Sequence, residues 1–492
     1  MGKKSNSTYL SLVTASLLAC GDGSGRRSDG EGSIGSIGSV GTGDETSADD
    51  RSDTSAGTDG SASSASHGND DADSGPLKFD VNEPTIPCQN LECDQVVCDD
   101  PNVTTTVSGV VYDPSGTLPL YNVQVYIPNA PVGPIVDDLI CDQCDAELSG
   151  SPLVTAVTDT EGRFVLENAP VGANIPLVMQ VGKWRRQVTI PNVNACQPNE
   201  LVDPDLTRLP RSSAEGNLPR IALTTGSADP LFCLLRRLGI DDSEYGIAGS
   251  NARIHFYRGV TGSSSFGAGF GASPGATFPN ATATLWNSGW EDYDIVMLSC
   301  EGSVYANDKN NHRVKLRDYI DNGGRVFATH FHYSWMTTAD APADLASVAS
   351  FKSNWNNISG LVDIDQSFPK GEALADWLDY VDGSSPHGRF NVSGGRDHTN
   401  WIVQGLAQRW VTVGANEQIM YFTFNAPIGA PEARQCGRMV YSDIHVSTGA
   451  GSATAAFPGA CNNSELSEQE KVLIFMLFDL SACIQPDDQP PG

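Results

Sequence analysis

Apolar and polar residues alternate along one stretch of the chain in the pattern of half-buried β-strands. The alternation starts at Val107, returns at 123–127 and continues with Phe164 and Leu166 after a turn rich in acidic residues. Gly and Pro punctuate these runs, as they do between short strands. We therefore expect residues 81–210 to fold as a small β-sandwich.

A different pattern begins at Pro219, where short apolar runs alternate with apolar stripes at helical spacing. The segments that carry it are 221–225, 231–238, 293–298, 314–320, 325–329 and a last helix that opens with the capping box Ser467-x-x-Glu470. Strands that alternate with helices favour a mostly parallel sheet. The chain is thus predicted to be multidomain, with a doubly wound, flavodoxin-like α/β domain over 215–484 and its sites at the carboxyl ends of the strands.

The N-terminus has the features of an export signal. Two lysines precede the short apolar run 10–18, and the sequence LLAC that follows ends at Cys20. This motif is similar to the lipobox of bacterial lipoproteins, which implies a signal peptide over 1–19 and lipid attachment to Cys20. The alternative is an ordinary signal peptide. Gly21 favours the outer membrane or cell surface over the inner membrane.

Residues 20–80 are mostly Gly, Ser and Asp and contain few large apolar residues. Such a segment buries too little surface to offset the entropy of ordering, so we expect a disordered acidic linker that acts as a spacer. The whole chain carries 60 Asp and Glu against 30 Lys and Arg, a formal charge of −30. This balance excludes a nucleic-acid partner and leaves the lipid anchor as the contact with the membrane.

The strand region resembles the carboxypeptidase regulatory-like (transthyretin-like) domain in the segments SGVVYD, PLYNVQVYI and TDTEGRFVLENAPVG. The resemblance covers roughly 105–195. It implies a seven-strand sandwich without chemistry of its own, of the kind used as a stalk or an adhesion module.

The chain has 12 Cys, a number that favours disulfides in an exported protein. Six are expected to form three disulfides around the sandwich, with zinc or redox roles as the alternative: Cys88, Cys93, Cys98, Cys141, Cys144 and Cys196. Their connectivity stays open. Further on, Cys436 and Cys461 flank one loop, and Cys233 could reach Cys483 on the last helix. Cys300 is then the residue expected to keep its thiol.

The second domain resembles the class I glutamine amidotransferase-like superfamily, and within it the ThuA-like branch. The matching segments are YDIVMLSCEG, LRDYIDNGGRVFATHFH, DHTNWIVQGL, NEQIMYF and CGRMVYSDIHVS. In active relatives the strand after the Gly-Gly turn leads to an elbow that bears a nucleophilic Cys, and here that elbow position is His330. The late His matches His445, and its acidic partner is replaced by Ser447. Because imidazole cannot do thiolate acyl chemistry, intact amidotransferase activity is not expected.

Two constellations of side chains remain as candidates for chemistry. Cys300 and Glu301 end a strand near the elbow, so Cys300 with His330 or His445 would make a nucleophile pair. His330, His332 and His445, with Asp443 and Glu301, would offer ligands for a divalent metal. The alternative for each is a structural role. Aromatic residues that would line a sugar-binding cleft, or else belong to the core, are Tyr333, Trp335, Trp355, Trp377 and Trp401.

The complete layout resembles a family of bacterial lipoproteins of unknown function, some of which carry the label tryptophan synthase alpha chain. That label implies a βα barrel, which neither the sandwich nor the strand–helix count fits. The expectation is an exported, lipid-anchored binding or structural protein with a degenerate amidotransferase-like domain and no cofactor other than the candidate metal. The alternatives are a hydrolase that uses Cys300 or a His-bound metal, and a carbohydrate-binding module; a glycan or an envelope protein is the expected partner.

Overall fold

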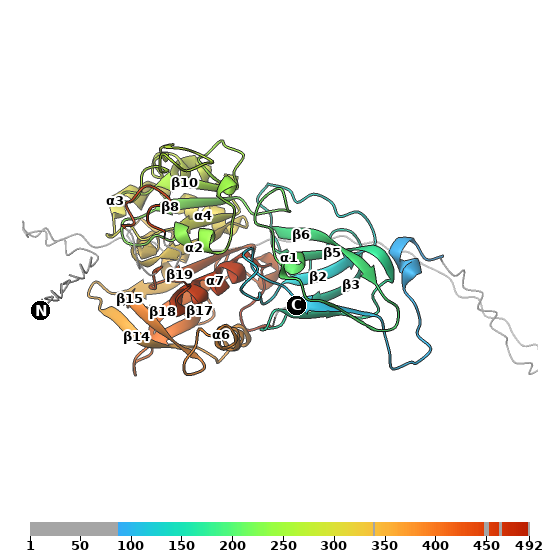
Figure 1. The fold of residues 1–492 in the computed structure, drawn as a ribbon. Coiled ribbons are helices and arrows are strands. Elements are labelled where there is room, and N and C mark those ends of the chain that lie inside the picture. The colour runs from blue at the N-terminus through green and yellow to red at the C-terminus, as the bar shows by residue number, and fades with distance from the viewer. Residues whose placement is uncertain (1–86, 338–339, 447–451, 462–464, 491–492) are drawn as a thin grey trace, which may run out of the picture. The chain divides into compact units, whose positions relative to one another are not determined.

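The computed structural model describes residues 87–337, 340–446, 452–461 and 465–490, and from Cys88 onward they belong to one compact unit (Figure 1). The predicted signal peptide 1–19, Cys20 and the whole predicted linker 20–80 lie outside the described residues. Among the helices that the structure describes, none has the length and apolar character needed to cross a bilayer.

The first part is a sandwich of seven strands in two sheets, as the alternating pattern predicted. One sheet has the order β4-β1-β7 and the other β3-β2-β5-β6. Their bounds are β1 (Thr106–Val110), β2 (Gln124–Pro128), β3 (Pro152–Val157), β4 (Arg163–Leu166), β5 (Gly172–Val181), β6 (Trp184–Val193) and β7 (Pro198–Leu201). Val107, Val125 and Leu166 are fully buried between the sheets, which explains the alternation.

The second part is built on a ten-stranded sheet of order β15-β14-β17-β18-β19-β12-β11-β8-β10-β9. The parallel strands are β8 (Ile221–Thr225), β9 (Tyr245–Gly246), β10 (Ile254–Arg258), β11 (Ile295–Leu298), β12 (Arg325–Thr329) and β19 (Gly437–Ser442). Every residue of β8, β11, β12 and β19 is buried, as expected for strands covered on both faces.

The prediction of a mostly parallel sheet holds for only this half. Beyond β19 the sheet continues through four antiparallel pairings. Its strands there are β14 (Asn357–Ile364), β15 (Arg389–Arg396), β17 (Gln408–Val413) and β18 (Gln418–Ala426), and β13 (Ala349–Phe351) pairs separately with β16 (Thr399–Ile402). β14 and β15 are joined through α6, whereas β17 and β18 are consecutive strands joined by a short turn.

Helices lie on the large sheet and between it and the sandwich (Figure 1). The α-helices are α1 (Pro204–Thr207), α2 (Phe232–Arg237), α3 (Ala306–Lys309), α4 (Arg313–Asp321), α5 (Ala343–Ser347), α6 (Pro369–Tyr380) and α7 (Glu468–Ser481). The predicted capping box of α7 is present, with the Ser467 and Glu470 side chains each meeting the other's backbone N–H. Phe478 of α7 packs on Trp184 of β6, and Phe475 stacks on Tyr121, so sandwich and large sheet share one core.

Short single-turn helices complete the chain. Their bounds are η1 (Asn90–Asp94), η2 (Asp242–Glu244), η3 (Leu285–Gly289), η4 (Trp290–Asp292), η5 (Asn310–His312), η6 (His330–Trp335) and η7 (Glu432–Arg434).

All ten cysteines proposed for disulfides form them, but three of the five bonds pair cysteines that we had not expected to meet. The bonds are Cys88–Cys93, Cys98–Cys196, Cys141–Cys436, Cys144–Cys483 and Cys233–Cys461. The expected pairs 436 with 461 and 233 with 483 are therefore wrong, and the six cysteines near the sandwich do not pair only among themselves. The reason is that the insert between β2 and β3 lies against the C-terminal part of the chain, where Ile484 N–H donates to the Asp142 carbonyl.

Candidate metal centre

Three neighbouring strands of the large sheet deliver the candidate side chains to one edge. Cys300 follows β11, His330 follows β12, and Asp443 and His445 follow β19. These strands are adjacent and parallel, in the order β11-β12-β19. Because the carboxyl ends of parallel strands meet at one edge, residues far apart in sequence come together there.

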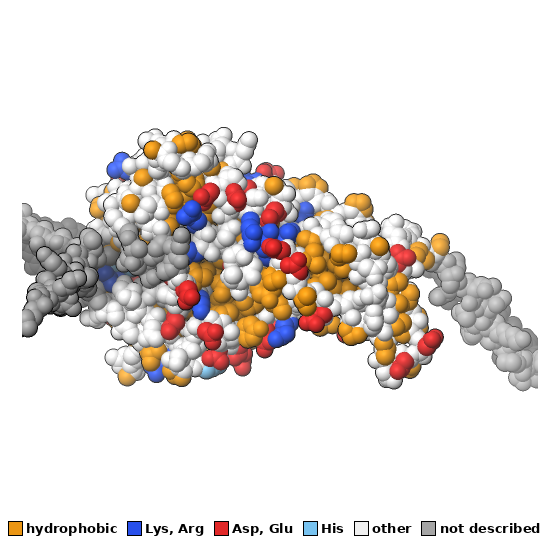
Figure 2. Space-filling view, in the orientation of Figure 1, with side chains coloured by type: hydrophobic (Ala, Val, Ile, Leu, Met, Phe, Trp, Pro, Cys, Tyr) orange, Lys and Arg blue, Asp and Glu red, His pale blue; other side chains and the backbone are white. Residues whose placement is uncertain are grey.

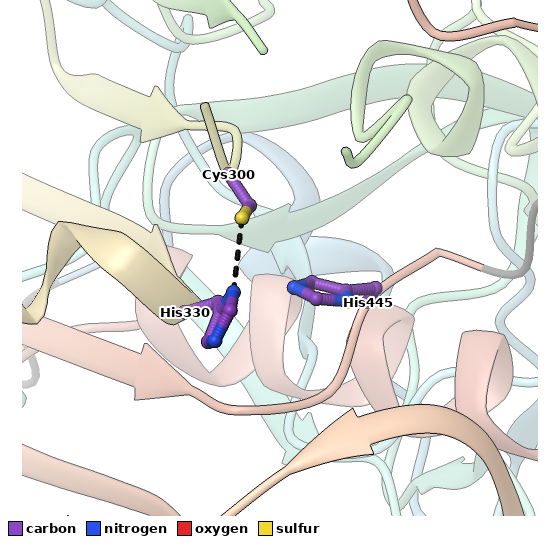
Figure 3. Close-up of side chains that lie close together, drawn as sticks. All are labelled: Cys300, His330 and His445. Atoms are coloured by element: carbon purple, nitrogen blue, oxygen red, sulfur yellow. Dashed lines mark hydrogen bonds between the residues drawn. The ribbon is translucent and has the colours of Figure 1, made fainter. Parts of the chain in front are cut away.

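The side chains of Cys300, His330 and His445 converge (Figure 3). Cys300 Sγ lies 3.1 Å from His330 Nδ1. The centroids of the His330 and His445 rings are 5.0 Å apart. One ligand atom from each of the three lies within 4.8 Å of the others. Cys300 and His330 are fully buried and His445 is 6% exposed, so the group is shielded from bulk water.

His330 occupies the strained elbow position that the sequence assigned to it. Its φ is 47°, in the left-handed region that L-residues with a Cβ rarely adopt. The backbone is held there because the Tyr441 hydroxyl lies 2.8 Å from the His330 carbonyl oxygen. The elbow turns the ring inward, so that Nδ1 faces Cys300 while Nε2 lies 3.1 Å from His398 Nδ1.

The buried carboxylate of Asp229 is linked by hydrogen bonds to the backbone of Cys300, through Thr329, and to the backbone next to His445. The Cys300 N–H donates to Thr329 Oγ1 at 2.9 Å, and the Thr329 hydroxyl lies 2.8 Å from Asp229 Oδ2. The other carboxylate oxygen, Oδ1, accepts the N–H of Val446 at 3.1 Å. Asp229 is fully buried and therefore fixes the backbone on both sides of the group.

Burial keeps the histidines of this group neutral. Desolvation, together with the Arg396 guanidinium, lowers the pKa of His445 to about 3. Desolvation also lowers the pKa of His398 to about 4. Desolvation also puts the pKa of His330 well below its ordinary value. Neutral imidazole is the form that binds metal ions.

The carboxyl group of Asp443 lies beside the His398 ring. Burial raises its pKa to about 7, although hydrogen bonds from Tyr441 and from the Thr399 N–H act in the opposite direction. Its Oδ1 lies 3.8 Å from His398 Nδ1. The pairs thus form a continuous line from Cys300 through His330 and His398 to Asp443.

No family model matches this chain. No curated protein matches it either. Among solved structures, two mutants of a type II cohesin–X-dockerin complex from Acetivibrio cellulolyticus share 16% and 17% identity, over 30% and 31% of this chain and 79% and 95% of theirs, with TM-scores of 0.15 and 0.16. The major pilin subunit BcpA of Bacillus cereus shares 15% identity over 22% of this chain and 31% of its own, with a TM-score of 0.14. Scores this low carry no conclusion about activity.

Two of the predicted site residues lie elsewhere. His332 was expected on the same face as His330, but the segment is the helical turn η6 and not a strand. His332 Nε2 therefore lies 2.9 Å from the Ser299 carbonyl oxygen, and Trp335 Nε1–H donates to its Nδ1. Glu301 points away from the group and accepts hydrogen bonds from Lys309 Nζ and from the Val260 N–H, both at 2.6 Å.

Sequence reasoning missed His398, which lies between β15 and β16 and contacts His330. Its segment DHTNW matched the family pattern, but no spacing connected it with the strand ends, because it comes from the antiparallel part of the sheet. Arg396, at the end of β15, lies with its guanidinium 4.8 Å from the Trp355 ring centre, and this ring in turn lies near His398.

The aromatic residues divide between core and surface. Trp335 is fully buried and Trp377 is 1% exposed, so neither can line a cleft open to solvent. Trp401 is 49% exposed. The sugar-binding interpretation thereby loses two of the residues that suggested it.

Proposed function

We propose that this chain is a lipid-anchored protein of the bacterial cell envelope whose α/β part binds a transition-metal ion through Cys300, His330 and His445. The observation that carries the proposal is the convergence of one sulfur and two imidazoles, all buried, within 4.8 Å. Cys300 takes part in none of the five disulfides, and its thiolate would be the sulfur ligand.

The separation of the Cys300 and His330 ligand atoms suits a small ion. A tetrahedral ion bound at about 2.0 Å to nitrogen and about 2.3 Å to sulfur keeps its ligand atoms about 3.3 to 3.6 Å apart. Cys300 Sγ and His330 Nδ1 are 3.1 Å apart and need to separate only slightly. The mixed sulfur and nitrogen donors favour zinc, copper or cobalt over calcium or magnesium.

His445 is oriented as a ligand. A hydrogen bond to the backbone of Gly394 raises the pKa of His445 against the effect of burial, whereas its Nε2 is buried and has no hydrogen-bond partner among the described residues. The nitrogen that faces Gly394 is therefore Nδ1. A ligand histidine ordinarily donates its second ring N–H to a carbonyl or carboxylate in this way, which fixes the tautomer and leaves the other nitrogen for the metal.

The proposal also covers the fold around the site and the location of the protein in the cell. The strand order β10-β8-β11-β12-β19 corresponds to 2-1-3-4-5, which supports a flavodoxin-like core with an antiparallel extension. The amidotransferase-like resemblance is consistent with this strand order, whereas the histidine at the elbow position departs from the nucleophilic Cys of active relatives. Anchored at Cys20, the module would meet an envelope protein or a glycan, and its net charge of −30 would repel polyanions.

A second candidate is a hydrolase in which Cys300 is the nucleophile and His330 its base. The separation of 3.1 Å between Sγ and Nδ1 favours it. Against it stands the burial of both side chains, which leaves a substrate no path to the sulfur without a conformational change. An ion is much smaller than a substrate and needs only a narrow entry path.

Elemental analysis and cobalt titration of the purified, disulfide-bonded full chain test the proposal. We expect bound metal, and on substitution with Co²⁺ a sulfur-to-metal charge-transfer band that Cys300→Ser abolishes. His387→Ala is the matched control, since this exposed histidine pairs with Asp376 outside the site. Absence of metal together with rapid modification of Cys300 by a thiol-reactive probe would contradict the proposal and favour the hydrolase.

A further inference from the structure

The second ring nitrogen of His330 faces a second set of ligand atoms. His330, His398 and Asp443 each offer one atom within 4.8 Å of the others, as Cys300, His330 and His445 do on the first side. His330 belongs to both groups, and its two nitrogens point to different ones. Nδ1 lies 3.1 Å from Cys300 Sγ, and Nε2 lies 3.1 Å from His398 Nδ1.

The geometry points to a two-metal centre in which the imidazolate of His330 bridges the ions. The first ion takes Cys300 Sγ, His330 Nδ1 and His445 Nε2, and the second takes His330 Nε2, His398 Nδ1 and Asp443. This inference rests on the proposed function, because the first ion is the one proposed there. With metal–nitrogen bonds of about 2.0 Å on both sides of one ring, the ions lie about 6 Å apart.

The charges of the ligands match two ions. Binding replaces the thiol proton of Cys300 and the last ring N–H proton of His330, and both protons leave to the buffer. Two divalent cations then face one thiolate, one imidazolate and one carboxylate, which leaves a single positive charge. Each ion has at least one anionic ligand that is not shared, Cys300 on the first and Asp443 on the second.

The surroundings of Asp443 fit a metal ligand better than a structural carboxylate. It is fully buried, yet among the described residues no Lys or Arg side-chain nitrogen lies within 4.0 Å of its carboxylate oxygens. A buried carboxylate ordinarily has a cationic partner. The Tyr441 hydroxyl, 2.8 Å from Oδ1, and the Thr399 N–H, 3.2 Å from Oδ2, orient it as outer-shell groups orient ligating carboxylates.

The test is the stoichiometry of Co²⁺ and Zn²⁺ on the metal-free, disulfide-bonded full chain. We expect two equivalents for the natural chain and one for His398→Ala, which keeps the sulfur-to-cobalt band of the first site. Asp443→Asn preserves the shape of the side chain and serves if His398→Ala fails to fold. His330→Ala should lose both equivalents, and His387→Ala neither.

The outcomes separate this inference from the proposed function. One equivalent with the cobalt–sulfur band in the natural chain would overturn the bridged pair and leave the single-ion proposal standing. Two equivalents that persist in both His398→Ala and Asp443→Asn would place the second ion elsewhere and also overturn the bridge. No bound metal at all would overturn both.

Discussion

The buried ion pair between Glu301 and Lys309 stabilises the loop that follows Cys300. Both side chains are almost completely buried, at 1% and 0% exposure, and the Nζ to Oε2 distance is 2.6 Å. Lys309→Met removes the cation and leaves the Glu301 carboxylate in the interior with the Val260 N–H as its hydrogen-bond donor in the described part of the chain. Breaking one partner of a buried pair costs about 3–5 kcal/mol, so we expect a loss of that size in the free energy of unfolding.

The double variant Glu301→Gln with Lys309→Met isolates the electrostatic cause. Gln has almost the shape of Glu and still accepts the Val260 N–H, but it carries no charge to be compensated. We expect it to recover up to about 3 kcal/mol relative to Lys309→Met alone, which is the upper range of coupling between contacting residues. Urea denaturation of the full chain with intact disulfides measures both, provided the slope is unchanged.

The control is Arg236→Met, because Arg236 pairs with Asp242 where the side chains are 32% and 44% exposed. That substitution should cost less than about 1 kcal/mol. The reasoning fails if Lys309→Met costs no more than this control, or if the double variant is no more stable than the single one.

Three further predictions concern pH, packing and backbone strain. Hydrogen bonds from Arg208 are the main reason that the pKa of Glu215 falls from 4.5 to about 2. A carboxyl pKa lowered by folding adds stability that is complete above pH 4.5 and lost as the pH falls toward 2, so Glu215→Gln should flatten the pH dependence of the unfolding midpoint in that window. Trp377→Ala should cost about 3–5 kcal/mol in denaturation experiments because Trp377 is core, whereas Trp401→Ala should stay within about 0.5 kcal/mol; equal effects would contradict this. The His330→Gly variant should be about 1 kcal/mol more stable to denaturation than the His330→Ala variant, because residue 330 has a positive φ. The reverse order would exclude backbone strain at this position.

Much of the site was accessible from the sequence because strand ends define it. Apolar runs identify β11 and β12 as buried strands, and the residues just after each run must then lie at the same edge. This rule places Cys300 there, whereas His330 and His445 were assigned through the resemblance to the amidotransferase-like superfamily. His332 was misplaced because the rule of alternating faces applies only while the strand continues, and η6 begins at His330.

His398 and the disulfide partners depended on tertiary contacts that no local pattern records. His398 reaches the site from the antiparallel half of the sheet, whose strands look like those of any meander. By their position in the sequence, Cys141 and Cys144 are assigned to the sandwich. Their partners are decided by where the insert between β2 and β3 lies, and an irregular segment carries no periodicity from which to infer it.

The two cysteines of the insert bond to different places, Cys436 before β19 and Cys483 after α7. One consequence is topological. A peptide bond severed anywhere between Cys144 and Cys233 leaves the amino-terminal piece covalently attached to the carboxyl-terminal one. A protease that cut the connection near α1 would thus yield a single band on a non-reducing gel and two bands after reduction.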